Sequence, residues 1–416
     1  MNPPPRSHYK WELLLLCWLA NFLNQGDRQI FNSILPLIRS GLGASDVQMG
    51  LVATLFSLAF GLLIPVAGWL GDRASRKWIV CGSLLTFSIG TLCTGLSGGL
   101  LTLILFRSIA TGAGESFYTP SALSLLGQHH QTTRGLAMSI NQTALYVGIV
   151  CSSWIAAVIG ERFGWRYSFF TFGGFGLLLA IILIIRLRND PPETSAAQGA
   201  GKPKISEILA VLRRKPTVYL LTLAFACMVF GGQGFMTWMP TLLYEKFHLP
   251  LATAAFQSVF LHYLFAFFGV LAGGWLSDRW ARNHPVARLY LGSCGLLFSA
   301  PFLYLLGATD EPILIYVALA LFGFSRGVYD SNIFAALFEV VPSTYRSTAT
   351  GLMISFAYAT GAMAPLILGY IKQHGSLSVG MSLMAPVYAA GALLLWIGAR
   401  FFFARDYVPP NPLTNH

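Results

Sequence analysis

The sequence predicts an all-α membrane protein whose twelve transmembrane helices form two pseudo-symmetric halves of six helices each. Charged residues make up 10% of the chain and hydrophobic residues 55%, whereas soluble domains contain about 25% charged residues. Apolar runs of about 20 residues, long enough to cross ~30 Å of hydrocarbon, recur along the whole length. The run Gly68-Trp-Leu-Gly-Asp72-Arg73 returns 206 residues later as Gly274-Trp-Leu-Ser-Asp278-Arg279. A unit repeated at half the chain length indicates two homologous halves.

Hydrophobic periodicity places the twelve helices between short polar connections. We expect them at residues 11–34, 48–70, 78–97, 100–125, 135–159, 166–187, 218–242, 253–276, 288–306, 312–336, 346–370 and 379–403. One long polar segment, residues 188–217, interrupts this series. It is predicted to be a cytoplasmic linker between an N-terminal six-helix half (1–187) and a C-terminal six-helix half (218–416).

The distribution of basic residues predicts how the chain lies in the membrane. If the N-terminus is cytoplasmic, 19 of the 27 lysines and arginines fall on the cytoplasmic side, 5 on the outer side and 3 inside the membrane. Because cytoplasmic loops carry the excess of positive charge, we expect a multi-pass protein of the bacterial inner membrane with both termini cytoplasmic. The net charge of +11 does not indicate nucleic-acid binding, because the basic residues lie between spans. No sequence feature requires more than a monomer.

Four charged residues lie in the interior of the predicted spans of the first half, away from the span ends. Asp27 and Arg28 are in the first span, and Arg107 and Glu115 are in the fourth. At 1.5 Å per residue, the first pair lies ~10 Å below the outer end of its span and Arg107 ~12 Å below the outer end of its own. Ionisable groups inside a bilayer face a cavity or pair with one another. The four residues therefore form either a static network that locks two helices together or a site for substrate and protons, and the cost of burying them favours the second.

The charge balance of these four residues predicts proton-linked binding of an anion. Arginine stays protonated, so the carboxylates must carry the proton. Protonating one carboxylate leaves an arginine without its partner, and an anionic substrate can replace that partner through a bidentate contact. Proton and anion then favour each other's binding. We expect no cofactor besides the proton, since the six cysteines lie singly in apolar runs and no metal-binding pattern is present.

These features resemble the major facilitator superfamily over essentially the whole chain. The resemblance rests on the two six-helix halves, the basic central linker and the loop Gly-x-x-x-Asp-Arg-x-x-Arg-Lys at residues 68–77. Asn21-Phe-Leu-Asn-Gln-Gly-Asp-Arg-Gln-Ile30 and Gly112-Ala-Gly-Glu115 are similar to the organic anion:cation symporters, which carry sugar acids and related carboxylates. The same segments, with Trp238-Met-Pro-Thr-Leu-Leu243, also resemble the spinster-type carriers, some of which move lysolipids. The resemblance implies the superfamily fold and alternating access between the two sides of the membrane.

The resemblance also implies substrate and proton roles for Asp27, Arg28, Arg107 and Glu115, with one departure in spacing. In the anion symporters the arginine of the fourth helix precedes the glycine by four residues and the glutamate by seven. Here Gly112 follows Arg107 by five residues and Glu115 follows it by eight. One extra residue turns the carboxylate by ~100° around the helix. Either a π-bulge absorbs this residue, or Arg107 has another role.

Other polar residues in the spans are further candidates for binding substrate or protons. Arg326 and Asp330 form an i,i+4 pair that can bridge on one helix face, either for structure or to bind the far end of a polar substrate. His262 is a lone intramembrane histidine for which a packing role is favoured over a proton relay. Five more can hydrogen-bond a substrate or hold helices together: Asn141, Gln142, Tyr146, Gln233 and Tyr358.

The repeated loop motif predicts a gating element at the cytoplasmic ends of two helices. Its residues are Asp72, Arg73, Arg76 and Lys77 in the first half, with Asp278 and Arg279 in the second. An acid at such a turn can meet a neighbouring helix N-terminus and stabilise one closed arrangement.

We therefore expect a secondary active transporter that carries a small organic anion, such as a sugar acid, together with protons. The alternative is a spinster-like carrier of a lysolipid or other amphipathic molecule, which the Phe-rich composition favours. An intramembrane enzyme is a further alternative, but it would need a nucleophile or a metal site that the sequence lacks. A non-transporting sensor with the same fold is another alternative, which the absence of a proton site would favour. The expected partners are a small-molecule substrate and the lipid bilayer, without nucleic acid.

Overall fold

A computed structural model describes residues 7–71, 74–130, 133–188, 212–342 and 345–408. This part of the chain is helical and contains no strand, which confirms the predicted all-α class. Eleven of its helical stretches are long and apolar enough to cross a membrane. The helix α1 (Ser7–Ser33) is not among these eleven, although it covers the first predicted span. Its asparagines, glutamines and the Asp27–Arg28 pair lower its hydropathy.

The helices of the first half follow the predicted spans. They are α1, α2 (Leu35–Leu42), α3 (Asp46–Gly71), α4 (Arg76–Gly95), α5 (Leu100–Leu103), the π-helix η1 (Ile104–Thr111), α6 (Gly112–Ser116), α7 (Tyr118–His129), α8 (Arg134–Phe163) and α9 (Trp165–Arg186). The segments α5, η1, α6 and α7 together make the fourth predicted span. The predicted linker lies largely outside the described residues.

The helices of the second half are longer at first and then more often broken. They are α11 (Pro216–Phe247), α12 (Leu251–Ala281), α13 (Ala287–Ala308), α14 (Pro312–Asp330), α15 (Ile333–Val340), α16 (Arg346–Gly361), α17 (Met363–His374), α18 (Leu377–Ser382), α19 (Ala385–Ile397), the π-helix η3 (Gly398–Phe402) and α20 (Phe403–Asp406). Three predicted spans, at 312–336, 346–370 and 379–403, are each built from more than one segment.

Prolines explain several of these breaks. Four helix breaks, at Ile34, Phe117, Ala362 and Leu383–Met384, each lie two or three residues before a proline: Pro36, Pro120, Pro365 and Pro386. A proline in a helix lacks an N–H donor, and its ring clashes with the carbonyl four residues earlier. The helix therefore ends just before the proline and restarts with it in the first turn.

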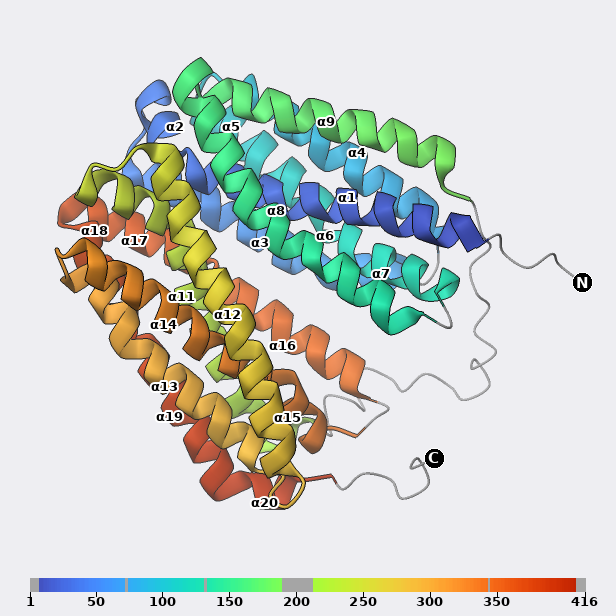
Figure 1. The fold of residues 1–416 in the computed structure, drawn as a ribbon, viewed down its shortest axis with the longest axis vertical. Coiled ribbons are helices and arrows are strands. Elements are labelled where there is room, and N and C mark those ends of the chain that lie inside the picture. Colours follow the sequence, from blue (N-terminus) through green and yellow to red (C-terminus); the bar gives the residue numbers. More distant parts are fainter. Residues whose placement is uncertain (1–6, 72–73, 131–132, 189–211, 343–344, 409–416) are drawn as a thin grey trace, which may run out of the picture. The chain divides into compact units, whose positions relative to one another are not determined.

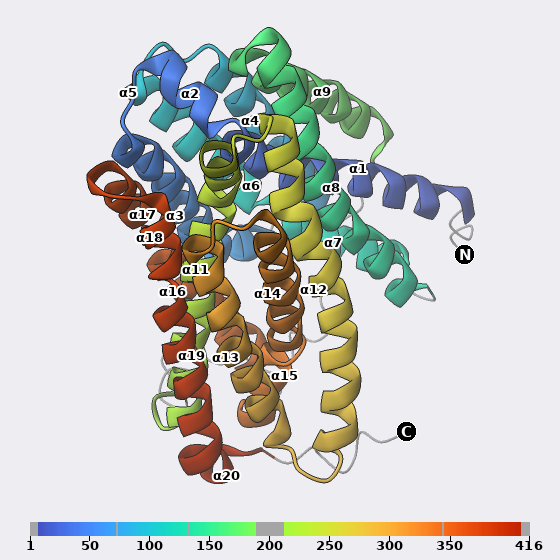
Figure 2. The same cartoon turned by 60° about the vertical axis from the view of Figure 1, so that its left-hand side comes forward.

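The chain divides into two compact units that interleave along the sequence. The first comprises Met1–Thr194, Met236–Val259 and Pro365–Gln373, and the second comprises Ser195–Phe235, Phe260–Ala364 and His374–His416. In the first unit α1 packs along α8, and α4 packs along α9 (Figures 1 and 2). In the second unit α13 lies between α14 and α19 (Figure 2). The division into two six-helix halves is inferred from the sequence repeat and differs from these contact-based units. It stays a prediction.

Candidate functional site

Four charged side chains from three segments of the first unit meet inside it. Arg28 of α1 donates from Nε to Glu115 Oε2 of α6 at 2.6 Å. Arg107 of η1 donates from Nη1 to Asp27 Oδ2 of α1 at 3.0 Å. The same Nη1 lies 4.0 Å from Glu115 Oε1. The structure thus brings Asp27, Arg28, Arg107 and Glu115, all selected from the sequence, into one alternating network of two acids and two bases.

A π-helix explains how Arg107 and Glu115 reach the same network despite their spacing. The eight residues Ile104–Thr111 form η1, which lies between regular helical turns of the fourth span. A wider π-turn absorbs one extra residue without rotating the next helical turns. Of the two alternatives that the spacing left open, the structure contains the π-helical one.

Glycines allow the segment carrying Glu115 to pack tightly against its neighbours. A Cβ on Gly112 would lie 3.0 Å from the carbonyl oxygen of Phe56 in α3, and one on Gly114 would lie 2.7 Å from the backbone nitrogen of Phe87 in α4. Any side chain at Gly114 would push α6 away from α4. These two glycines therefore fix the depth at which the Glu115 carboxylate sits.

Burial separates Arg28 from the other three charged residues. The side chain of Arg28 is 19% exposed, whereas those of Asp27, Arg107 and Glu115 are between 0% and 4% exposed. The Arg28 guanidinium lies 4.0 Å from the ring centre of Phe60, and that of Arg107 lies 4.3 Å from Phe56. Aromatic faces attract cations, so they offset part of the cost of burying the two guanidinium groups.

The two carboxylates differ in how fully their oxygens are hydrogen-bonded. Asp27 Oδ1 accepts a 2.6 Å hydrogen bond from the Thr91 hydroxyl of α4, and Oδ2 accepts one from Arg107. Glu115 Oε2 is bonded to Arg28, but Oε1 is buried and has no hydrogen-bond partner among the described residues. Buried Arg28 Nη2 and Arg107 Nε also lack partners there. The network therefore holds one unsatisfied acceptor and two unsatisfied donors, which is unusual for a purely structural cluster.

The three polar candidates on α8 have different surroundings. Asn141 is 4% exposed, and its side-chain Oδ1 is buried without a hydrogen-bond partner in the described structure, while its backbone carbonyl accepts from Asn21. Gln142 is exposed and Tyr146 is half-buried.

A second group of candidates meets in the second unit around Arg326 of α14. Its Nε lies 3.6 Å from Asp330 Oδ2, and its Nη1 lies 3.5 Å from His262 Nε2 of α12. The His262 ring, 1% exposed, packs against both Phe235 and Phe322 at centroid distances of 4.8 and 4.9 Å. Tyr358 of α16 is half-buried in the same unit. Gln233 of α11 is half-buried in the same unit.

The predicted gating residues are only partly described. Asp72 and Arg73 lie outside the described residues, and Arg76 and Lys77 form the first turn of α4. In the second unit Arg288 lies 3.2 Å from Asp278 and 2.9 Å from Glu339. The Arg279 guanidinium lies 6.0 Å from the ring centre of Trp275.

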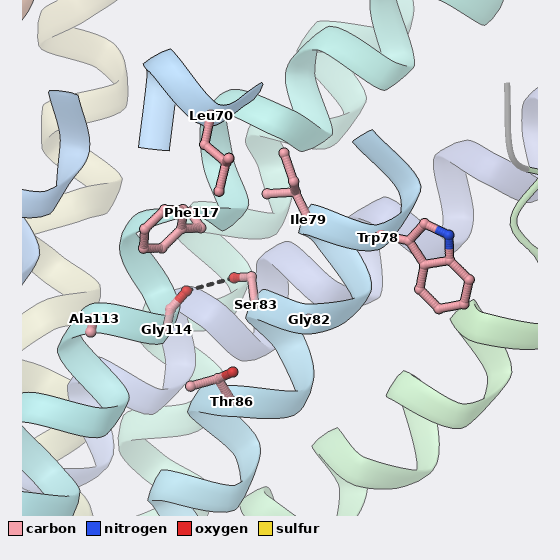
Figure 3. A pocket seen from close by; sticks show the side chains of 9 residues that line it. All are labelled: Leu70, Trp78, Ile79, Gly82, Ser83, Thr86, Ala113, Gly114 and Phe117. Carbon is pink, nitrogen blue, oxygen red and sulfur yellow. Dashed lines mark hydrogen bonds between the residues drawn. The ribbon is translucent and has the colours of Figure 1, made fainter. Parts of the chain in front are cut away.

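A cavity of about 370 Å³ lies behind the segment that carries Glu115 (Figure 3). Its walls come from the end of α3, from α4 and from the start of the α6–α7 segment. At its floor the Ser83 hydroxyl donates a 2.6 Å hydrogen bond to the Gly114 carbonyl. The lining contains no charged residue: Leu70, Trp78, Ile79, Gly82, Ser83, Thr86, Ala113, Gly114 and Phe117. It is therefore separate from the charged network.

Sequence reasoning missed a ring of four alternating charges in the first unit, which we call the four-charge ring. Arg39 of α2 lies 2.7 Å from Asp46 and 3.1 Å from Glu245, and Lys372 lies 2.9 Å from both carboxylates. Burial disfavours the charged form of Arg39, but Asp46 and Glu245 outweigh it and raise the pKa of Arg39. Contacting members of the ring are up to 326 residues apart in sequence, so no local pattern indicates that they meet.

Other residues missed from the sequence are the neutral neighbours of the charged network. Thr91, Phe56 and Phe60 are ordinary residues of apolar helices, and only their positions in space give them a role. Within the described residues, no group of three histidine, cysteine or acidic side chains is placed to hold a metal ion.

Comparison with known proteins gives a consistent result. The sequence profile of the Major Facilitator Superfamily matches residues 17–365. Spinster homolog 1 of Xenopus laevis is 27% identical over 87% of this chain and 73% of its own length. A probable sulfoacetate transporter of Cupriavidus necator is 25% identical over 90% of both chains. The crystal structure of a bacterial homolog of the human lysosomal transporter Spinster superposes with a TM-score of 0.84 at 22% identity, covering 98% of this chain and 100% of that one.

Proposed function

We propose that this chain, which belongs to the Major Facilitator Superfamily, carries an organic anion across the membrane together with a proton. Its family and its transporter relatives make it an integral membrane transporter of small molecules and not an enzyme. The observation that carries the finer proposal is the buried network of Asp27, Arg28, Arg107 and Glu115.

The hydrogen-bonding pattern supports Glu115 as the residue that takes up the proton. Both oxygens of Asp27 already accept hydrogen bonds, so protonating Asp27 would weaken its bonds to Thr91 and Arg107. Glu115 Oε1 accepts none among the described residues, so a proton can add there without breaking a hydrogen bond. We therefore place the exchangeable proton on Glu115 Oε1, and we place Asp27 as the fixed counter-ion of Arg107.

Coupling follows from the loss of charge when Glu115 is protonated. Neutral Glu115 no longer balances Arg28, whose side chain is the most exposed of the four. An anionic substrate that approaches Arg28 then restores neutrality, so proton and anion stabilise each other in the loaded state. Neither alone leaves the network neutral, and this disfavours movement of the half-loaded carrier.

A spinster-like carrier of an amphipathic lipid is the second candidate function. The similarity to spinster homologs from several vertebrates favours it. In that case the anion would be a lipid headgroup, and the same network would bind it. The two candidates differ in the body of the substrate and not in the chemistry of the charged group.

We further propose that the transporter acts as a monomer in a bacterial inner membrane, with both termini in the cytoplasm. The excess of basic residues in alternate loops supports this orientation. It places the four-charge ring at the outer surface and the repeated loop motifs at the cytoplasmic surface. The two six-helix halves would then expose the binding site to each side in turn.

Uptake into proteoliposomes tests the proposal directly. Labelled glucuronate, sulfoacetate and lysophosphatidate are offered with and without an inward proton gradient. Gradient-driven uptake of one of the two acids supports anion symport, and uptake of lysophosphatidate alone supports the lipid carrier. If the proton gradient changes the uptake of none of the three compounds, proton coupling is refuted.

A further inference from the structure

The three arginines inside the predicted spans differ in how well a carboxylate neutralises them. Arg28 lies 2.6 Å from Glu115, and Arg107 lies 3.0 Å from Asp27. Arg326 is 3.6 Å from Asp330, which is beyond hydrogen-bond distance for these atoms. Arg326 Nε is buried and has no hydrogen-bond partner among the described residues. Of the three, Arg326 is therefore the cation whose charge is least satisfied by the protein itself.

Arg326 and His262 each have one buried nitrogen without a hydrogen-bond partner among the described residues. Its Nη1 faces His262 Nε2 at 3.5 Å, and because arginine can only donate, that nitrogen must be the acceptor. The hydrogen of the neutral imidazole then sits on Nδ1, which is buried without a partner in the described structure. A cluster with unsatisfied donors on both Arg326 and His262 fits a ligand that supplies acceptors, such as an oxyanion.

The guanidinium of Arg326 lies beside a glycine of α11 on one face. Its atoms lie 3.4 to 3.7 Å from where a Cβ on Gly232 would be, so they face the bare backbone of α11 there. The side chain is 18% exposed, and that of Asp330 is 37% exposed. Neither residue is therefore sealed off, in contrast to Asp27, Arg107 and Glu115.

We propose that Arg326 binds the anionic group of the substrate and that Asp330 is a resident counter-ion, which the substrate displaces from Arg326. The substrate class is an organic molecule with a carboxylate, sulfonate or phosphate group, since a guanidinium binds all three through paired N–H donors. This assignment rests on the proposed function. Arg28 stays available to an anion once Glu115 is protonated, and Arg326 is a second cation that can bind an anionic group.

If the substrate displaces Asp330 from Arg326, charge-removing variants of the two residues should behave differently from variants of a purely structural ion pair. If Asp330 competes with the substrate for Arg326, removing its charge leaves the cation unbalanced and tightens anion binding. If the two residues only brace α14, removing either one loosens the site in the same direction. Asp330→Asn and Arg326→Gln therefore change affinity in opposite directions under displacement and in the same direction under bracing.

The test is equilibrium binding of tritiated glucuronate, sulfoacetate and lysophosphatidate to the purified full-length protein in detergent. We expect Arg326→Gln to weaken binding of the bound anion at least tenfold and Asp330→Asn to tighten it at least threefold. The double variant Arg326→Gln/Asp330→Asn keeps the charge balanced and should bind as weakly as Arg326→Gln, which would show that Asp330→Asn acts through Arg326. Arg282→Gln and Asp310→Asn, both on exposed residues, are matched controls expected to bind as the unmodified protein does.

The outcomes separate this assignment from the proposed function. Binding of glucuronate or sulfoacetate identifies a small acid, and binding of lysophosphatidate alone identifies a lipid headgroup. If the unmodified protein binds none of the three anions, the organic-anion proposal and this site both fail. If it binds one and Arg326→Gln binds it equally well, or Asp330→Asn leaves affinity unchanged or weaker, only the displacement site fails.

Discussion

The two carboxylates of the charged network have unequal surroundings, and this leads to a prediction for single residues. Glu115 has one oxygen without a hydrogen-bond partner in the described structure, whereas Thr91 and Arg107 occupy both oxygens of Asp27. We expect Glu115→Gln to abolish accumulation driven by a proton gradient, because glutamine cannot exchange a proton. Exchange of labelled for unlabelled substrate should continue. Proteoliposome uptake and counterflow measure the two activities separately.

The comparison variants for this prediction are Asp27→Asn and Glu311→Gln. Asp27→Asn leaves buried Arg107 without its close carboxylate, and breaking a buried pair in this way costs about 3–5 kcal/mol. It should therefore lower the thermal stability of the purified protein more than Glu115→Gln does, since Arg28 is partly exposed. Glu311 is exposed, and its substitution should change neither property. Accumulation by Glu115→Gln at the unmodified level would contradict the assignment of the proton to Glu115.

The charged members of the network were visible in the sequence because charge inside an apolar run is rare and costly. Its neutral members were not. Thr91, Phe56 and Phe60 belong to residue types that are common in membrane helices, so nothing local distinguishes them from packing residues. Thr91 contacts Asp27, Phe56 contacts Arg107 and Phe60 contacts Arg28. These contacts form only when the chain folds and brings the helices together.

At the scale of elements, the π-helix η1 makes the fourth span tolerant of one particular deletion. Because η1 absorbs one extra residue, deleting Ala110 should convert it to a regular helix and leave Arg107 and Glu115 on the same face. We expect this variant to keep most of its transport activity. Deleting Ser124 from the regular helix α7 is the control, and it should abolish transport by rotating everything after it by ~100°. Equal loss in both variants would show that η1 does not absorb the extra residue.

The sequence predicts the existence of the spans better than their continuity. Hydropathy is enough to place every predicted span except the first, since every backbone polar group in a bilayer must be bonded internally. Four predicted spans are nevertheless broken, three of them just before Pro120, Pro365 and Pro386. Membrane helices often tolerate proline, so its position indicates a possible break without requiring one. Packing against neighbouring helices decides the outcome, and the sequence does not contain that information in local form.

The four-charge ring joins α2 and α3 to the ends of α11 and α17, so its contribution to stability should be cooperative. Lys372 is 8% exposed and contacts both Asp46 and Glu245 at 2.9 Å. We expect a double-mutant cycle of Lys372→Met with Glu245→Gln to give a coupling energy of about 1 kcal/mol in thermal or chemical unfolding. The same cycle with Glu311→Gln in place of Glu245→Gln should be additive. A coupling energy near zero would mean that the ring is too hydrated to hold these helices together.

For the whole molecule, the distribution of basic residues predicts an orientation that chemical labelling can test. Ser40 and Asn283 are exposed residues beside opposite ends of the predicted spans. In intact cells, a membrane-impermeant maleimide should label Ser40→Cys above the background of the six native cysteines, but not Asn283→Cys. Permeabilised cells should label both. The reverse pattern would place both termini outside and invert the positions proposed for the four-charge ring and the loop motifs.

The assignment of a single exchangeable proton fixes the electrical behaviour of the whole transport cycle. One proton carried with a monovalent anion moves no net charge, so the membrane potential should not drive accumulation of glucuronate. A difference of one pH unit should then support about a tenfold concentration gradient, since both correspond to about 1.4 kcal/mol. If Asp27 also carried a proton, each cycle would move one positive charge, and 100 mV would add ~2.3 kcal/mol of driving force. Proteoliposomes with a potassium diffusion potential of about 100 mV and no pH difference distinguish the two cases. Glucuronate should equilibrate without accumulating, and strong accumulation under that potential would mean that both carboxylates of the network exchange protons.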